Sequence, residues 1–136
     1  MALDDLFATG ETFVGAVAQL FRGPESETEA IIKRLYTEDC DITVMGNKMT
    51  RDDLLAYIKK VQGEYSTIDF RTERFVRNGN QFAEKHISIG QAKYGSVTEA
   101  EVWVMGELNA EGKAIVLQET MRLITGSVDN IEELKS

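Results

Sequence analysis

The sequence predicts an α+β fold, with three N-terminal helices covering one face of an antiparallel sheet. Helix-type spacing of apolar residues is found before Gly63, and extended apolar runs fill most of the chain after it. Two of these runs flank the segment 109–113 (NAEGK), which is typical of a β-hairpin. Helices that precede the strands, rather than alternating with them, indicate that the two kinds of element are segregated.

Composition and charge favour one domain over residues 1–126, followed by a short acidic tail over 127–136. Fifteen basic against 23 acidic residues give a net charge of -8, which argues against nucleic-acid and anionic-membrane partners. The acidic N-terminus is unlike a signal peptide, and no apolar run approaches the roughly 18 residues of a membrane span. We expect a cytoplasmic protein whose single cysteine, Cys40, is a small buried hydrophobe.

Apolar spacing and capping residues predict the first two helices. The first runs from Leu3 to Phe21 and ends at Gly23-Pro24, because glycine caps a helix and proline cannot continue it. The second begins at once with a capping box formed by Ser26 and Glu29, and it stops before Asp39.

A short strand and a third helix follow. Residues 41–45 (DITVM) read as a strand that turns at 46–48, and Thr50 with Asp53 forms the capping box of a helix that Gly63 closes.

The remaining chain predicts a four-stranded antiparallel meander. Residues 66–76 and 81–91 flank Asn78-Gly79, a strong signal for a tight hairpin because both residues tolerate positive φ. A turn at 94–96 then leads into the closing hairpin, which spans 97–125.

This order of elements resembles the nuclear transport factor 2-like superfamily, which includes ketosteroid isomerases and SnoaL-like polyketide cyclases. The strings that carry the resemblance are LYTEDCDITV (35–44), TRDDLLAYI (50–58) and ELNAEGKAIVLQETMRL (107–123). The resemblance implies a cone-shaped, strongly curved sheet whose concave face and three helices enclose a pocket for a small apolar molecule. It also implies a homodimer that packs through the convex face of the sheet.

The isomerase chemistry implied by the resemblance is not met. The position of the isomerase base carboxylate falls near Val44 and the position of its protonated acid falls near Val104, so both carboxylates are missing. Its oxyanion tyrosine falls near Ala16, and only a supporting tyrosine position is met, by Tyr57. Tyr57 equally suits a core position with a satisfied hydroxyl.

The two-residue period of the strands indicates a different site. Glu119 interrupts a face otherwise formed by Ile115, Leu117, Met121 and Leu123, which matches the concave face of the resembled fold. Glu84, His86 and Ser88 share a face of their own strand, which the same comparison also turns inward.

Glu84, His86 and Glu119 are therefore the candidate catalytic residues, as an acid/base set that needs neither metal nor cofactor. The candidate ligand-binding residues are Tyr57, Ser88, Val104, Leu117 and Met121.

Structural roles are alternatives for the same residues. Glu84 and His86 face solvent if the strand register is shifted by one residue. For Glu119 the alternative is a structural ion pair with Arg71, Arg74 or Arg122.

Trp103 and Met105 point to the outer face, between Glu101 and Glu107. A tryptophan on a charged face is typical of an interface centre with a polar rim, although a singly exposed tryptophan is the alternative.

Three functions fit these features. The first is a SnoaL-like enzyme, metal-free and cofactor-free, for proton-transfer, isomerase or hydration chemistry on an apolar substrate. The second is a binding protein without turnover, and the third is a dimeric interaction module with a filled pocket. An interior cavity with converging polar groups favours the first two.

Overall fold

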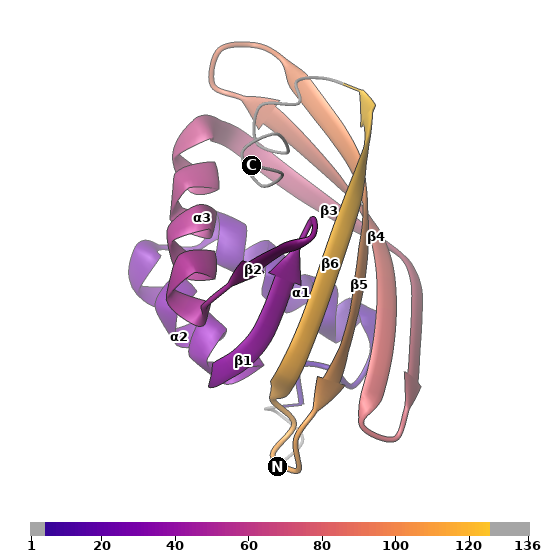
Figure 1. Cartoon of the computed structure of the whole chain (residues 1–136). Coiled ribbons are helices and arrows are strands. Elements are labelled where there is room, and N and C mark those ends of the chain that lie inside the picture. Colours follow the sequence, from indigo (N-terminus) through magenta and orange to yellow (C-terminus); the bar gives the residue numbers. More distant parts are fainter. Residues whose placement is uncertain (1–4, 126–136) are drawn as a thin grey trace.

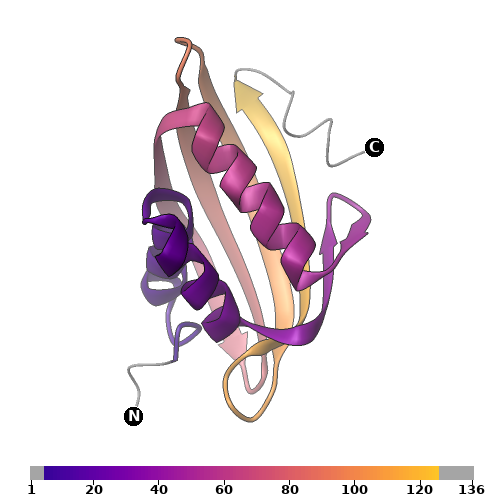
Figure 2. The same cartoon turned by 90° about the vertical axis from the view of Figure 1, so that its left-hand side faces the viewer.

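Three helices lie on one face of a six-stranded sheet (Figures 1 and 2) in the computed structural model, which describes residues 5–125. The helices are α1 (Gly10–Arg22), α2 (Glu25–Leu35) and α3 (Arg51–Glu64). The strands are β1 (Tyr36–Val44), β2 (Asn47–Met49), β3 (Tyr65–Asn78), β4 (Gln81–Ala92), β5 (Val97–Leu108) and β6 (Ala114–Thr125). The predicted α+β class is confirmed, whereas the predicted tail over 127–136 lies outside the described residues.

The sheet is mixed rather than wholly antiparallel. Its strand order is β2-β1-β6-β5-β4-β3, and the last four strands of the chain form the predicted antiparallel meander. Strand β1, however, pairs in parallel with β6 and carries the short β2 on its other side. This arrangement satisfies backbone groups along the edge of β6 that would otherwise be unpaired, and it places the first strand of the chain beside the last.

The sheet curves around the helices, and irregular pairing contributes to its shape. Between β5 and β6 the register shifts so that Glu107 opposes Val116 while Leu108 opposes Ala114, which leaves Ile115 without a partner. The prediction that Ile115 belongs to the inward face is wrong. Ile115 is 36% exposed, because the extra residue reverses the alternation at that point. At Gly106, on the opposite strand, a Cβ atom would lie 2.3 Å from the carbonyl oxygen of Val116, so no side chain fits there.

Two predicted helix starts are wrong. Helix α1 begins at Gly10, after a capping box formed by Thr9 and Thr12, and residues 5–9 are not helical. Helix α2 has Pro24 as its N-cap, with no capping side chain, so Ser26 lies inside the first turn. The proline carbonyl accepts hydrogen bonds from the amides of Glu27 and Thr28, and no described side chain caps the remaining amides of the first turn. The predicted end of the first helix at Gly23 is confirmed.

The third helix begins where it was predicted to begin. Two turns, in contrast, lie at positions that differ from the predicted ones. Thr50 and Asp53 form the predicted capping box. The β1–β2 turn is Met45-Gly46, both with positive φ, and Asn47 already belongs to a strand. The β3–β4 loop is Gly79-Asn80, since Asn78 pairs with Gln81 and only Gly79 has positive φ. The hairpin is thus confirmed, but its turn lies one residue later than predicted.

The core lies between the helices and the inward face of the sheet. An aromatic cluster of Phe7, Phe13 and Phe82 fills one end of it, with ring centroids 4.7 to 5.8 Å apart. Cys40 is 5% exposed, and burial with two neighbouring aspartates raises the pKa of its thiol to about 12, which fits the predicted hydrophobic role. Within residues 5–125 no helix is long and apolar enough to cross a membrane.

Candidate functional site

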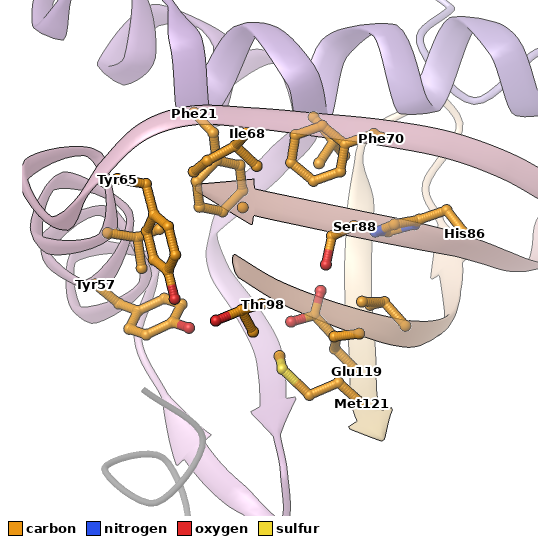
Figure 3. A pocket seen from close by; sticks show the side chains of 15 residues that line it. Phe21, Tyr57, Tyr65, Ile68, Phe70, His86, Ser88, Thr98, Glu119 and Met121 are labelled. Carbon is orange, nitrogen blue, oxygen red and sulfur yellow. The ribbon is translucent and has the colours of Figure 1, made fainter. Parts of the chain in front are cut away.

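A cavity of about 120 Å³ lies between the sheet and helices α1 and α3 (Figure 3). Four adjacent strands, β3 to β6, form its floor and walls, because their inward side chains alternate with outward ones. Its lining is mostly aliphatic and aromatic. The lining residues are Val17, Phe21, Tyr57, Val61, Tyr65, Ile68, Phe70, His86, Ser88, Gly90, Thr98, Ala100, Val102, Glu119 and Met121.

Strand register brings the three predicted catalytic residues to one region. Val104 pairs with Glu84 on one side and with Glu119 on the other, so the two carboxylates lie in one row across β4, β5 and β6. His86 lies in the adjacent row, two residues further along β4. Residues opposite one another on paired strands share a face, and the two glutamates and the histidine therefore all point toward the helices.

Glu84 and His86 form a buried hydrogen-bonded pair. Each residue is only 3% exposed, and His86 Nδ1 lies 2.7 Å from Glu84 Oε1. A carboxylate accepts this bond, so the neutral imidazole carries its proton on Nδ1 and leaves Nε2 as an acceptor. His86 lines the cavity, and the ring of Phe70 packs against it edge-on at 5.6 Å. The solvent-facing alternative for this pair is wrong.

Glu84 lies behind His86 and does not line the cavity. Its second oxygen, Oε2, is buried and has no hydrogen-bond partner among the residues that the structure describes. An unpaired, buried carboxylate oxygen is costly, so the hydrogen bond from the histidine N–H to the other oxygen is important for keeping Glu84 buried.

Glu119 directs its carboxylate into the cavity (Figure 3). Burial raises the pKa of this carboxyl above its ordinary value, the charge of Glu84 raises it further, and the neighbouring His86 opposes the rise. A raised pKa favours the neutral acid, which is a hydrogen-bond donor.

The predicted alternative of a structural ion pair for Glu119 does not hold over residues 5–125. Arg122 pairs instead with Glu101 at 3.3 Å, and Arg71 lies 4.0 Å from Glu73. None of the ion pairs found in this range involves Glu119 or joins it to Arg74. The carboxyl therefore faces the cavity without a lysine or arginine of this range paired to it.

Three of the five predicted ligand-binding residues line the cavity. Tyr57, Ser88 and Met121 do so, whereas Val104 and Leu117, each 2% exposed, are enclosed in the core. The prediction for Val104 and Leu117 fails because of where they lie along the sheet, not because of the side to which they point. Val104 and Leu117 both point inward, but they lie in the part of the sheet where core side chains fill the interior.

Several lining residues escaped the sequence prediction. Tyr65, Thr98 and Phe70 reach the cavity from β3 and β5. The alternation of Ile68 and Phe70 on one strand is a signal that was available, whereas Tyr65 stands at the junction of α3 and β3, where neither period applies.

Among residues 5–125 no helix covers the outer face of the sheet (Figure 1), and the two predicted interface residues are exposed there. Trp103 is 46% exposed and Met105 is 53% exposed. Lys85 Nζ lies 4.8 Å from the centroid of the tryptophan ring, and the indole N–H donates to Glu101. A charged network therefore borders an apolar patch at this position.

Across residues 5–125 no group of three or more His, Cys, Asp or Glu side chains is arranged to hold a metal ion. The polar groups that line the apolar cavity are instead the imidazole of His86, the carboxyl of Glu119, whose pKa is raised, and several hydroxyls.

Comparison with known proteins shows the fold. No family model and no curated protein matches the chain. A nuclear transport factor 2-like protein of unknown function from an Exiguobacterium species is similar in structure, with a TM-score of 0.67 and 19% identity over 80% of this chain and 97% of that one. IdmH from Streptomyces antibioticus, a candidate polyketide cyclase, has a TM-score of 0.63 and 13% identity over 89% of this chain and 96% of its own.

A third similar structure is a candidate isomerase of the SnoaL-like family from Agrobacterium tumefaciens, with a TM-score of 0.62 and 13% identity over 83% of this chain and 97% of that one. All three likenesses extend over most of both chains. The chain therefore has the nuclear transport factor 2-like fold.

Proposed function

We propose that the protein is an enzyme of the SnoaL-like kind that moves a proton on a small, mainly apolar carbonyl compound without a cofactor. The observation that carries the proposal is the meeting of His86 and Glu119 at one apolar cavity. His86 is held by Glu84 at 2.7 Å, and Glu119 has no lysine or arginine among the described residues that line the cavity with it. An imidazole and a carboxyl group whose pKa is raised by burial suit proton transfer when both reach one apolar cavity.

In the proposed reaction Nε2 of His86 removes a proton from the carbon beside the carbonyl group. The electron pair of that C–H bond forms a carbon–carbon double bond, and the carbonyl π electrons move to the oxygen, which takes the proton of Glu119. The products of this step are a neutral enol, an imidazolium and a carboxylate. Glu84 stabilises the imidazolium through the Nδ1–H bond. Return of a proton to carbon then restores the two groups and completes exchange or isomerisation.

Acetophenone in D2O tests the proposal. It is a single-ring ketone with exchangeable methyl protons, and benzene is known to fill an apolar cavity of roughly 150 Å³, close to the 120 Å³ found here. Proton NMR should show loss of the methyl signal that depends on the protein. His86→Gln and Glu119→Gln should each slow the exchange by about a hundredfold or more.

Glu111→Gln provides the matched control, because Glu111 is an exposed carboxylate in the β5–β6 loop. It should leave the exchange unchanged. Absence of protein-dependent exchange, together with ordinary acetophenone binding, would favour the alternative of a binding protein without turnover.

We also propose a homodimer through the outer face of the sheet, with Trp103 and Met105 near its centre. The proposal is supported by the exposed indole of Trp103 and thioether of Met105, which are bordered by charged residues that include Lys85 and Glu101. An apolar centre with a polar rim is the usual arrangement of a protein interface.

A further inference from the structure

The end of the cavity away from His86 is built around Gly90. His86 and Gly90 are four residues apart on the inward face of β4, or about 13 Å along an extended strand. A Cβ atom at Gly90 would lie 2.8 and 2.9 Å from two ring carbons of Tyr65, so the tyrosine ring rests directly on the strand backbone. Thr98 is paired with Gly90 on the neighbouring strand. The glycine therefore brings Tyr65 and Thr98 to the same end of the cavity.

Three hydroxyl groups gather at this end. The side chains of Tyr57, Tyr65 and Thr98 point their oxygens toward one another on the side of the cavity away from His86 (Figure 3). Thr98 Oγ1 is buried and has no hydrogen-bond partner within residues 5–125. A buried hydroxyl without a partner is costly, and a ligand that supplies the partner removes that cost. The tyrosine hydroxyls can each donate one bond and accept others.

We propose that Tyr57, Tyr65 and Thr98 form a second polar subsite, which binds a neutral hydroxyl group at the end of the substrate opposite the reacting carbonyl. This inference rests on the proposed function, since it takes the carbonyl end to lie at Glu119. The substrate class is a single-ring ketone with a hydroxyl across the ring, because an apolar body must lie between the two polar ends of a cavity of about 120 Å³.

Charge excludes an anionic group from this subsite. No lysine or arginine is among the described lining residues, and Glu119 is the one carboxylate among them. A carboxylate or phosphate of the ligand would enter without a counter-charge, which is far more costly than the burial of a hydroxyl. A neutral hydroxyl, by contrast, can form a hydrogen bond with Thr98 Oγ1 and brings no charge into the cavity.

The test compares 4′-hydroxyacetophenone with 4′-methylacetophenone, which have nearly the same shape. Calorimetric titration of the wild-type protein should give tighter binding of the hydroxyl compound by about fivefold or more. Thr98→Val and Tyr65→Phe keep the shape of each side chain and should each reduce this ratio toward one. Equal binding of the two compounds by the wild-type protein would overturn the inference.

Gly90→Ala tests the placement of Tyr65 independently of its hydroxyl. The added methyl group displaces the ring, so the preference for the hydroxyl compound should fall, as with the other two variants. Gly15→Ala is the matched control, because a Cβ atom at that exposed helix position meets nothing within 4 Å. Circular dichroism of each variant shows whether the fold is retained, and a preference that survives in a folded Gly90→Ala protein contradicts the placement.

Failure of the subsite and failure of the proposed function give different results. Glu119→Gln should slow proton exchange on acetophenone and still prefer the hydroxyl compound. Exchange without a hydroxyl preference in the wild-type protein overturns the subsite alone. A hydroxyl preference without exchange supports the subsite and overturns the proton-transfer reaction.

Discussion

His86 and Glu84 are joined by a hydrogen bond of 2.7 Å between Nδ1 and Oε1, although they stand only two residues apart on one strand. Both side chains point inward, and neither is more than 4% exposed. Because the pair forms within β4, its presence does not depend on how that strand is paired with its neighbours. The partner strands decide instead that the pair is buried and that His86 lines the cavity.

Glu84 is expected to act as a positioning residue for His86. Glu84→Ala removes the acceptor for Nδ1–H, so the imidazole proton should redistribute between the two nitrogens and acetophenone exchange should slow by about tenfold or more. Glu84→Gln keeps an acceptor oxygen at the same place and should restore the tautomer, seen as the ¹⁵N shifts of the ring, and part of the rate. An unchanged tautomer in Glu84→Ala would rule out this role.

Glu119 is expected to reduce stability at neutral pH. Burial raises the pKa of its carboxyl in the folded protein above the ordinary value of 4.5, so the folded state binds the proton more tightly than the unfolded state does. Its contribution to stability is therefore full below pH 4.5 and is lost as pH rises through the higher, folded pKa. Each unit of the difference corresponds to about 1.4 kcal/mol.

Glu119→Gln should thus be more stable than the wild-type protein at pH 7.5, and the difference should shrink toward pH 4. Urea unfolding at both pH values measures it. A variant that is less stable than the wild type at pH 7.5 would show that the glutamate has a stabilising partner.

Two similar capping signals should differ in energy. Thr50 caps α3 through the amide of Asp53, and Thr50→Ala should lower the free energy of unfolding by about 1 kcal/mol. Ser26 belongs to an equally good sequence pattern but caps nothing, so Ser26→Ala should change stability by less than about 0.5 kcal/mol. Chemical denaturation of both variants provides the comparison, and equal losses would contradict the observed cap at Pro24.

The proposed dimer depends on Trp103. Sedimentation at micromolar concentration should give about twice 15.2 kDa for the wild-type protein, and Trp103→Asp should return it to the monomer mass, because a charge at the centre of an apolar interface is left unpaired. Tyr94→Asp is the control, since Tyr94 is 99% exposed in a turn distant from the patch. A wild-type protein that sediments as a monomer excludes the interface.

The sequence by itself determined the features that depend on neighbouring residues. The α+β class, the capping box at Thr50 and the two long hairpins follow from local spacing and turn residues. The inward direction of Glu84, His86 and Glu119 also follows, because side chains alternate along β4 and along β6 beyond Ile115. The irregular position opposite His86 lies on β3 and leaves the alternation of β4 unchanged. Ile115 shows where that reasoning ends, since one unpaired residue reversed its direction.

Only the tertiary structure decided which inward residues meet the cavity and which fill the core. Val104 and Leu117 point the same way as Met121, yet they are buried in the hydrophobic core, whereas the methionine lines the cavity. The parallel pairing of β1 with β6 and the contact of Tyr65 with Gly90 join residues that are far apart in the sequence. No local pattern encodes such contacts, because they depend on how closely separate elements pack and on the space that their side chains leave.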